Sequence, residues 1–535
     1  MKLPELSATA APQFTDDASC KAWLESLPLA NVGAAQAELL AELEVLNRFP
    51  TTAANRLGVM ETLREPVNFV QIEQAKRFIN RPLPMAGSES AALADTVELW
   101  EQMRLGYQRC LELAQGGDAA MRAQAGLIAQ RLAAYAGLKM FHCHRAYREV
   151  PASDWRALHE AYARAERLGV AEEPVKDFLN RDVHDSSPRI AYARAVLMGL
   201  ASPNELTQRQ LTFVAFLLER WASKLEVSLQ PVAEGEGQPP LVADLAGEAC
   251  PRRPEPGEPP AAEPRYLDTR KLAKSLRNRV GLLRKGESPA KLALGEDCVQ
   301  PSCEQLLVYL FRQWCQAKSA RGATRRSSGG AARVCVEFEA VHRHFSGGGA
   351  RRPVEAKEMT QQQRQELETL GHIRTAQEPE ESGAPEHEDW RVVDDSPQGL
   401  RMLRPAGSGA KRYTHGQLIA VRPGDAKGYL LGQVRWLMVA ANGELHAGVK
   451  LMPGIPAATT VRPTGLNENN VRPIPAIALG ALPVAQLPAT LVLPLGAFKP
   501  KRLLEIAGDK PVNVRLTAII ERGVDFERVA YEAAQ

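Results

Sequence analysis

The hydrophobic positions of the first part of the chain recur with a helical period. In residues 91–114 and 119–150, apolar side chains return at intervals of three and four, which places them on one face of an α-helix. Residues 151–154 read Pro-Ala-Ser-Asp, a capping pattern that starts a new helix. The pattern extends from about residue 18 to 229 and is long enough to bury a core of its own. We therefore expect residues 1–230 to form an all-helical domain.

Strand-like segments replace the helical pattern in the second half of the chain. Each is short, apolar or alternating, and bounded by Gly-containing turns, and Asn442-Gly443 is a strong signal for a two-residue hairpin. Such a series predicts a small antiparallel barrel or sandwich, which we assign to residues 321–455. The expected strand segments are residues 332–340, 390–393, 399–403, 417–421, 429–439 and 444–451.

A second strand-rich region follows a Pro-rich stretch that reaches from about residue 453 to 487. It predicts a small C-terminal β unit within residues 456–535. The expected fold class is thus multidomain α+β, with an all-α N-terminal domain, a β-barrel and a small C-terminal β unit. The expected strands of the last unit are residues 490–493, 502–506, 512–516 and 526–531.

The region between the helical domain and the barrel, residues 231–320, has the composition of a linker with some secondary structure. Residues 234–264 are rich in Pro, Gly and Glu, which disfavours a packed core, although residues 241–245 suggest one strand. A basic run begins at Arg270, and its apolar positions keep helical spacing. We favour a helix with a cationic solvent face over a nucleic-acid contact, because no aromatic residues for base stacking lie nearby.

A second helix is expected at residues 304–317. Its apolar face, around Leu307, Leu310 and Trp314, needs a partner surface, and the N-terminal helical domain is the largest candidate. The helix ends immediately before Arg321.

Composition excludes several classes of protein. The net charge of +3 is small for 535 residues, no apolar run is long enough for a membrane span, and residues 1–17 lack the features of a signal peptide. No pair of the 8 cysteines has Cys-x-x-Cys spacing, and residues 142–144, His-Cys-His, lie in a helical pattern that points neighbours apart. The sequence also lacks a phosphate-binding loop and a nucleophile elbow. We expect a soluble cytoplasmic protein that binds no metal or cofactor and is not an enzyme.

Two short motifs give the barrel a candidate chemistry. Asp394, Ser396 and Gly399 form an Asp-x-Ser-x-x-Gly turn after a strand, and Arg321 and Arg325 form an Arg-x-x-x-Arg arm before the first strand. This order resembles the PilZ family of cyclic di-GMP receptors, over roughly residues 321–455. The spacing between the two motifs is long for that family, so residues 344–389 are expected to be an insertion.

The resemblance implies a cyclic di-GMP site made by Arg321, Arg325 and the neighbouring Arg326, with Asp394, Ser396 and Gly399. A carboxylate such as that of Asp394 accepts the paired N–H donors of a guanine edge. Arginine forks bind phosphate or the O6 and N7 atoms of guanine. Ser396 can hold the turn or bond the ligand, and Gly399 allows an unusual backbone conformation or a close approach to the ligand.

The expected function is a receptor that binds cyclic di-GMP and relays it to an unidentified protein partner through the helical domain. By resemblance, the output lies in the control of motility, pili, biofilm or exopolysaccharide. The alternative is a non-enzymatic scaffold whose barrel does not bind the ligand and whose helical and basic regions engage protein or nucleic acid. Nucleic acid is the less favoured partner.

Overall fold

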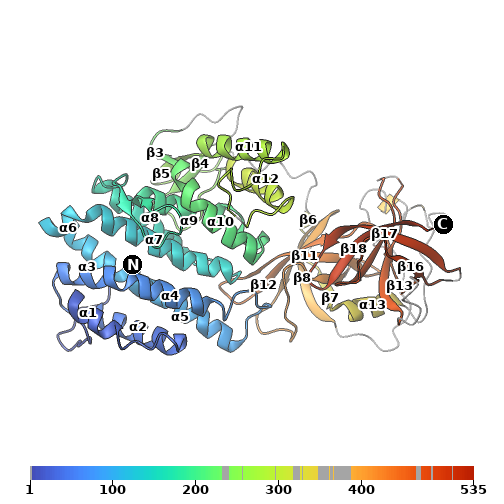
Figure 1. The fold of residues 1–535 in the computed structure, drawn as a ribbon, viewed down its shortest axis with the longest axis horizontal. Coiled ribbons are helices and arrows are strands. Elements are labelled where there is room, and N and C mark those ends of the chain that lie inside the picture. The colour runs from blue at the N-terminus through green and yellow to red at the C-terminus, as the bar shows by residue number, and fades with distance from the viewer. Residues whose placement is uncertain are drawn as a thin grey trace. The chain divides into compact units, whose positions relative to one another are not determined.

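A computed structural model defines two compact units (Figure 1). The first comprises Met1–Arg81 and Met85–Ala320, and the second comprises Pro82–Pro84 and Arg321–Gln535. The residues that the structure describes are 3–231, 240–255, 257–295, 297–316, 326–327, 329–346, 361, 365–366, 387–464, 472–483, 486–508 and 510–534.

Helices dominate the first unit, as the sequence predicts. Six of the helices from α1 to α10 begin where an Asp, Asn, Ser or Thr side chain caps the first turn; Thr207, for example, forms a capping box with Gln210. The 29-residue helix α5 packs on α2, α3 and α7, and its Trp100 and Tyr107 meet Tyr135 of α7 in a buried aromatic core. The helices are α1 (Asp17–Leu24), α2 (Val32–Leu46), α3 (Ala53–Thr62), α4 (Arg64–Ala75), α5 (Gly87–Gln115), α6 (Ala119–Ala123), α7 (Ala125–Arg145), α8 (Ala152–Arg167), α9 (Pro188–Leu200) and α10 (Gln208–Trp221).

The region expected to be a linker contains a small sheet and two helices, all within the first unit. Strands β3 (Glu226–Ser228), β5 (Pro264–Asp268) and β4 (Leu241–Asp244) pair in that order, so the strand suggested at residues 241–245 is confirmed. A further hairpin, β1 (Val175–Lys176) with β2 (Asp185–Ser186), has strands of only two residues and gave no signal in the sequence.

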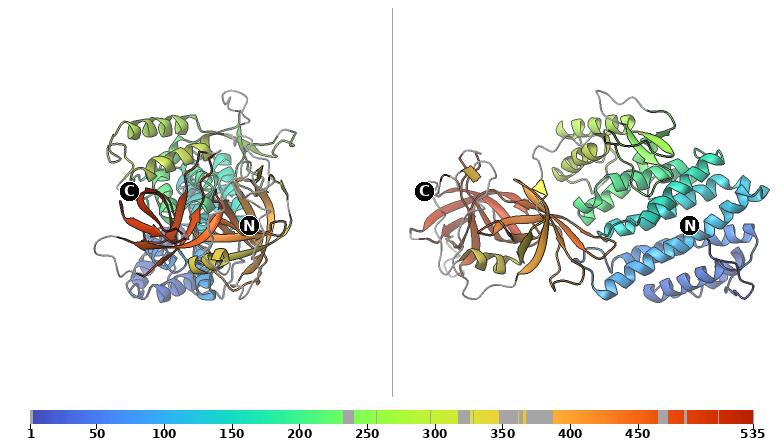
Figure 2. Two further views of the ribbon diagram at one scale, coloured as in Figure 1. Left: turned by 90° about the vertical axis from the view of Figure 1, so that its right-hand side faces the viewer. Right: turned by 180° about the vertical axis from the view of Figure 1, so that it is seen from behind.

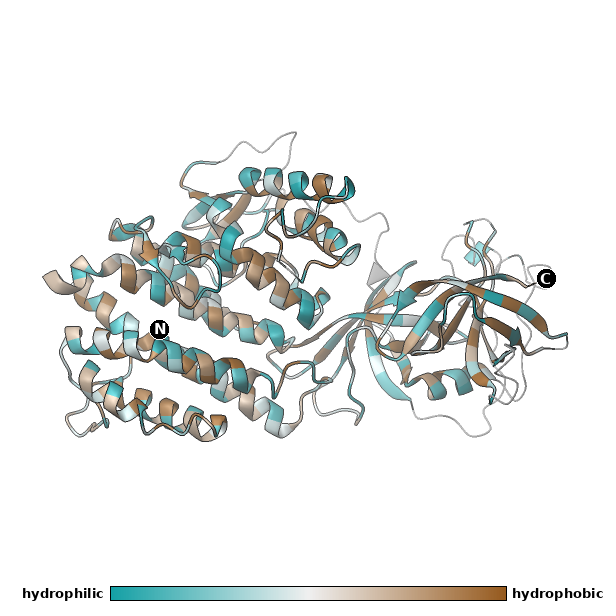
Figure 3. Cartoon of the chain, viewed as in Figure 1, coloured by the Kyte–Doolittle hydropathy of each residue, from teal (hydrophilic) through white to brown (hydrophobic). Residues whose placement is uncertain are grey.

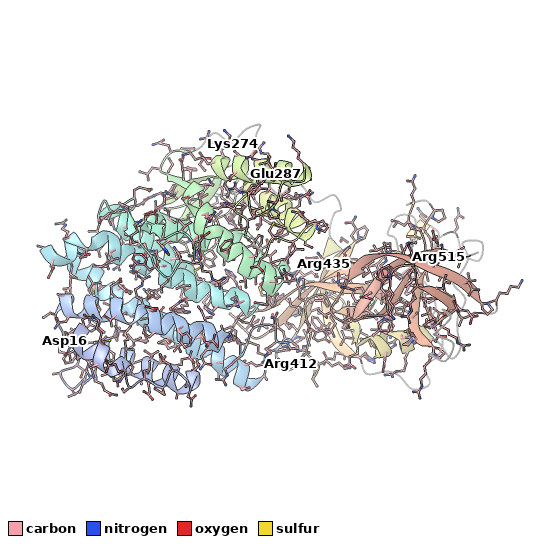
Figure 4. All side chains as sticks on the ribbon, viewed as in Figure 1. Asp16, Lys274, Glu287, Arg412, Arg435 and Arg515 are labelled. Atoms are coloured by element: carbon pink, nitrogen blue, oxygen red, sulfur yellow. A yellow bond between two sulfur atoms is a disulfide. The ribbon has the colours of Figure 1, made fainter. Side chains whose placement is uncertain are left out.

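The basic helix α11 (Arg270–Arg284) buries Leu272, Leu276, Val280 and Leu283, the expected apolar face. Figure 3 shows the two faces as alternating brown and teal bands along the ribbon. Its cations are mostly exposed, as expected for a cationic solvent face; Arg270 pairs with Asp268 at 2.7 Å at that surface, and only Arg279 is partly buried, with its guanidinium over Trp221. Lys274 is exposed on the outer side of the helix (Figure 4). This arrangement agrees with the structural interpretation of the basic run.

Helix α12 (Ser302–Cys315) docks on the helical domain, as predicted from its apolar face. Trp314 is 1% exposed, and its Nε1 donates a hydrogen bond of 2.8 Å to the carbonyl oxygen of Leu197 in α9. Tyr309 donates to the Ala201 carbonyl at 3.1 Å. Cys298 and Cys303, at the start of this helix, form a disulfide.

The second unit begins with a central closed antiparallel barrel. Its strand order is β8-β7-β10-β11-β12-β9, and β9 pairs back to β8. The two-residue strand β6 (Arg326–Ser327) extends the line of β7 along the same edge of β8, opposite β9. The other strands are β7 (Ala331–Val336), β8 (Glu388–Ser396), β9 (Gly399–Arg404), β10 (Leu418–Pro423), β11 (Leu430–Val439) and β12 (Leu445–Leu451).

One expected strand is too long in the prediction. Residues 332–340 were expected as a single strand, but β7 ends at Val336 and helix α13 (Phe338–Ser346) begins two residues later. Glu337 stands between them with φ of +76°, a conformation that interrupts the strand. Most of residues 347–386, within the expected insertion, lie outside the described residues.

A second closed barrel forms the C-terminal part (Figure 2), with strand order β13-β14-β15-β18-β17-β16. The four strands expected from the sequence are present, and the Pro-rich stretch, for which no strand was predicted, supplies two more. Prolines are tolerated there because they fall at or next to strand ends, as Pro456 and Pro463 do in β13. The strands are β13 (Pro456–Pro463), β14 (Ile474–Leu479), β15 (Thr490–Pro494), β16 (Leu503–Ile506), β17 (Val512–Arg522) and β18 (Phe526–Ala533).

The two barrels share one hydrophobic core within this unit. Phe338 and Val341 of α13 pack with Leu418 of the central barrel and with Ile477 and Phe526 of the C-terminal barrel. The turn between β17 and β18 reinforces the junction: Leu418 N donates to Asp525 Oδ1 at 2.9 Å, and burial raises the pKa of Asp525 to about 6.

None of the helices in the described part of the chain is both long and apolar enough to span a membrane.

Candidate ligand-binding face of the central barrel

The turn between β8 and β9 is built by the predicted motif itself. Ser396 and Gly399 pair directly across the hairpin, and Pro397 and Gln398 form its two-residue turn. The Ser396 hydroxyl donates to the Gly399 carbonyl oxygen at 3.1 Å. Of the two roles expected for Ser396, this geometry supplies the first, which is to hold the turn.

Gly399 is required by the packing of its own sheet. A Cβ at this position would lie within 2.5 Å of the carbonyl oxygen of Val449 in β12. The close approach expected at this glycine is therefore an approach to a neighbouring strand. It keeps β9 and β12 tightly paired beside the turn.

Asp394 follows a β-bulge at Val393, and the bulge determines what it faces. The register of β8 against β9 shifts between Val392 and Asp394, so that Asp394 stands opposite Arg401 of β9. On its other side it stands opposite Ser327 of β6. Asp394 is partly exposed, whereas Asp395 is 7% exposed.

Strand β6 runs beside the strand that carries Asp394. Arg326, the last residue predicted for the arginine arm, pairs with Asp395 through the backbone, and Ser327 pairs with Asp394. Arg321 and Arg325 lie outside the described residues, as does the side chain of Arg326.

Asp394 and Arg401 belong to a row of residues that stand opposite one another on neighbouring strands. The row continues from β9 across β12 and β11. Arg401 stands opposite Gly448 of β12, and Gly448 stands opposite Trp436 of β11. Because residues directly opposite each other share one face of a sheet, Asp394, Arg401 and Trp436 lie on the same face. That face points out of the barrel: Leu400 and Met402, the neighbours of Arg401, are buried, and Arg401 is only partly so.

Gly448 leaves space that the indole of Trp436 occupies. A Cβ at Gly448 would overlap Nε1, Cδ1 and Cε2 of the ring. The indole of Trp436 therefore lies over Gly448, the residue that stands between Trp436 and Arg401 in the row. A second bulge, between Val434 and Trp436, places the exposed Arg435 (Figure 4) beside it.

Two cationic residues, Arg401 and Lys450, lie on the same face of the sheet as Asp394. Arg401 follows it in the row, and its Nε is buried without a hydrogen-bond partner among the described residues. Lys450 lies opposite Gly399 in the next row and pairs with Glu521 at 3.1 Å. Together with the indole, these groups offer a carboxylate acceptor, a guanidinium donor and a π-face, the combination needed to hold a planar heterocycle that carries an anion.

The sequence analysis missed Arg401 and Trp436 as site residues. A signal for Arg401 was present, because it alternates with the apolar Leu400 and Met402 and so points outward. Trp436 follows a bulge, and the strand period alone does not assign its face.

A buried polar cluster supports the start of β8. The Arg404 guanidinium lies over the rings of both Trp390 and Tyr413, and it pairs with Glu388 at 2.9 Å. Glu388 also accepts from the Tyr413 hydroxyl at 2.7 Å and from Lys411 N at 2.6 Å. Burial disfavours the ionised carboxylate, but these hydrogen bonds outweigh it and lower the pKa of Glu388.

No metal site is found among the described residues: no three His, Cys, Asp or Glu side chains are grouped to hold an ion. In the His-Cys-His stretch of α7, all three side chains are buried. Burial lowers the pKa of His142 and of His144 to about 4, and His142 Nδ1 accepts a hydrogen bond from Trp100. These residues belong to the core of the helical domain.

Comparison with known proteins matches both ends of the chain. Residues 18–233 match the domain described as "Cyclic-di-GMP receptor FimW, N-terminal domain", and residues 459–534 match the "FimW C-terminal beta-barrel domain". Together the matches cover more than half of the chain. A curated relative, the cyclic-di-GMP receptor FimW of Pseudomonas aeruginosa, is 23% identical over 539 residues, covering 90% of this chain and 84% of the relative. None of these three descriptions names the PilZ family.

Proposed function

The chain belongs to the family of cyclic-di-GMP receptors to which FimW gives its name, and on this basis we propose that it binds cyclic di-GMP on the outer face of its central barrel. The protein acts as a receptor and leaves the dinucleotide unchanged. The matched family is one of receptors, and no catalytic family is indicated.

The pairing of β6 with β8 is the observation that carries the proposal. It pairs the backbone of Arg326 and Ser327 with Asp395 and Asp394, and Arg321 and Arg325 precede this strand in the sequence. We propose that these two arginines reach the face that carries Asp394, Arg401 and Trp436.

Each group has a role that matches the chemistry of the ligand. Asp394 accepts the N1–H and N2–H donors of one guanine, and Trp436 stacks on a base. Arg401 and the arginines of the arm bind phosphate oxygens or the O6 and N7 atoms of guanine, for which the guanidinium fork is suited. Ser396 and Gly399 contribute by fixing the hairpin on which Asp394 is carried.

The output of binding passes through the arm. The arm follows α12, and α12 is docked on the helical domain through Trp314. Ordering of the arm by the ligand therefore constrains a helix that the helical domain holds. We propose that an unidentified protein partner in the cytoplasm reads this change at the helical domain, in the control of motility, pili, biofilm or exopolysaccharide.

Calorimetric titration of the full chain with cyclic di-GMP, with GTP as competitor control, tests the proposal. Asp394→Ala should weaken binding by roughly 10- to 150-fold, the equivalent of about 1.5–3 kcal/mol for a charge-assisted hydrogen bond. Asp389→Ala is the matched control, because Asp389 is an exposed aspartate of the same strand outside the row. Arg321→Ala and Arg325→Ala should each cause a similar loss without unfolding the protein.

Two results would contradict the proposal. Folded protein that gives no heat with cyclic di-GMP would favour the scaffold alternative. Equal losses in the Asp394 and Asp389 variants would place the ligand elsewhere. Hydrogen exchange supplies the test of the relay: protection should change in residues 304–316 and within the helical domain when the ligand is added.

A further inference from the structure

The helical domain contains a pocket that the proposed function does not use. It lies between α4, α7, α9 and α10 and is closed on one side by the loop that joins β1 to β2. The cavity volume is about 130 Å³. A cavity of about 150 Å³ lined by apolar side chains can hold benzene, so the space here suits a single ring or a branched group of that size.

Small residues on two facing helices create this space. Gly137 of α7 approaches Ala195 of α9 so closely that a Cβ on the glycine would lie 3.1 Å from the alanine Cβ. Larger apolar side chains complete the walls: Leu138, Phe141, Met198 and Leu218. One part of the pocket is therefore an apolar chamber between helices.

The hydrogen-bond acceptors at the polar end of the pocket are already occupied. Asp177 accepts from Arg64 at 2.5 Å, from Gln130 at 3.0 Å and from Leu179 N at 3.2 Å. Glu219 accepts from Arg181 N at 3.1 Å and from Asp182 N at 3.2 Å, and lies 3.5 Å from Arg194. Neither carboxylate needs a further donor.

Two donors at the same end are not occupied. Arg64 Nε and the Tyr135 hydroxyl are buried, and neither donates a hydrogen bond to a described residue, although the Tyr135 oxygen lies within reach of the Arg64 guanidinium. The Arg64 side chain is 9% exposed and Tyr135 is 1% exposed. Burial raises the pKa of Tyr135 to about 12, so its hydroxyl keeps the proton and remains a donor at neutral pH. A buried donor without a partner is costly, which makes an acceptor at this position favourable.

We infer that this pocket binds a small organic anion, in which a carboxylate is attached to an aromatic ring or a branched apolar group. The carboxylate accepts from Arg64 Nε and the Tyr135 hydroxyl, and the apolar group fills the chamber between α7 and α9. Arg194 also lines the pocket, but its guanidinium is paired with Glu219 at 3.5 Å, so the preference for an anion rests on Arg64 and Tyr135. The site belongs to the first unit alone and does not depend on cyclic di-GMP binding.

Ligand-observed NMR on the full chain tests this inference, with benzoate as the probe. Benzyl alcohol is the neutral analogue of the same size, and acetate has the carboxylate without the ring. Benzoate should bind at least about tenfold more tightly than either, because only benzoate supplies both the acceptor and the apolar group. No binding of benzoate, or equal binding of benzyl alcohol, would overturn the inference.

Two variants locate the binding. Tyr135→Phe removes one donor and should weaken benzoate binding about tenfold. The variant should stay folded, because the ring that stacks on Tyr107 is kept. Ala215→Leu places a larger side chain in the lining of the pocket and should abolish binding. Ala94→Leu, on an exposed position of α5, is the matched control. Benzoate binding that survives Ala215→Leu unchanged would place the anion outside the pocket.

Discussion

Gly448 offers a way to displace Trp436 without altering Trp436 itself. An added methyl group would lie less than 2.5 Å from three atoms of the indole, whereas carbon atoms in contact are about 3.5–4.0 Å apart. The ring must therefore move by at least roughly 1 Å. It can do so because Trp436 is only partly buried on the outer face of the barrel. Gly448→Ala should thus leave the barrel folded and remove the indole from its position in the row.

The size of both effects follows from this geometry. If the displaced ring exposes about 50 Å² of apolar surface, the free energy of unfolding falls by about 1 kcal/mol. Stacking of a base on an aromatic side chain contributes about 1–3 kcal/mol, so loss of the stacking position raises the Kd for cyclic di-GMP by roughly 5- to 150-fold. The loss of binding should therefore equal or exceed the loss of stability.

A double-mutant cycle provides the assay. The Kd for cyclic di-GMP is measured by calorimetry for Gly448→Ala, for Trp436→Ala and for the double variant, and unfolding is followed in urea for each. If the added methyl group acts only by moving the ring, it has no further effect once the ring is absent. The double variant should then bind as weakly as Trp436→Ala alone.

Either of two results would refute this reasoning. An unchanged Kd in Gly448→Ala, together with normal binding by the native chain, would mean that Trp436 does not touch the ligand. Additive losses in the double variant would mean that the methyl group acts on the backbone of β12 and not through the indole.

Two further predictions concern stability. Glu388→Gln should lower the free energy of unfolding by about 1–3 kcal/mol at neutral pH. Because the pKa of Glu388 is lowered in the folded state, this contribution is present above the unfolded pKa of about 4.3 and is lost as the pH falls from there through the lower folded pKa. A difference in the free energy of unfolding between the variant and the native chain that stays constant down to pH 3 would contradict the role given to the carboxylate. Trp314→Ala should destabilise the docking of α12 by about 3–5 kcal/mol, since it removes a fully buried ring. The rate of amide hydrogen exchange in Ser302–Cys315 should rise. Unchanged protection of that helix would show that it is held by other contacts.

Helices and the faces of helices were predictable because a period of three to four persists through each of them. The apolar face of α12 allowed its docking on the helical domain to be predicted correctly. Leu307, Leu310 and Trp314 recur at helical spacing within this helix of fourteen residues, and all three are buried. The β1–β2 hairpin escaped prediction because a strand of two residues contains no period. Strands β13 and β14 escaped it because their prolines, at strand ends, resemble those of a loop.

The candidate site was predictable in its motifs but not in its surroundings. The side-chain period of a strand is two, so each bulge reverses the face assigned to every later residue. Bulges at Val393 and Arg435 precede Asp394 and Trp436, and neither has a signature in the sequence. The alignment of Arg401 with both residues depends on strand register, which is set by contacts between segments far apart in the chain.

The shared core of the two barrels has a consequence during synthesis on the ribosome. Phe338 of α13 packs in the same cluster as Phe526 of β18, which is translated 188 residues later (526 − 338). At about 5–20 residues per second, that interval is roughly 10–40 s. Until it ends, the apolar surface of α13 and the adjoining end of the central barrel is covered only in part, by the residues of the cluster that have already emerged. Chaperones that recognise exposed apolar segments have this interval in which to bind, and the emergence of β18 ends it.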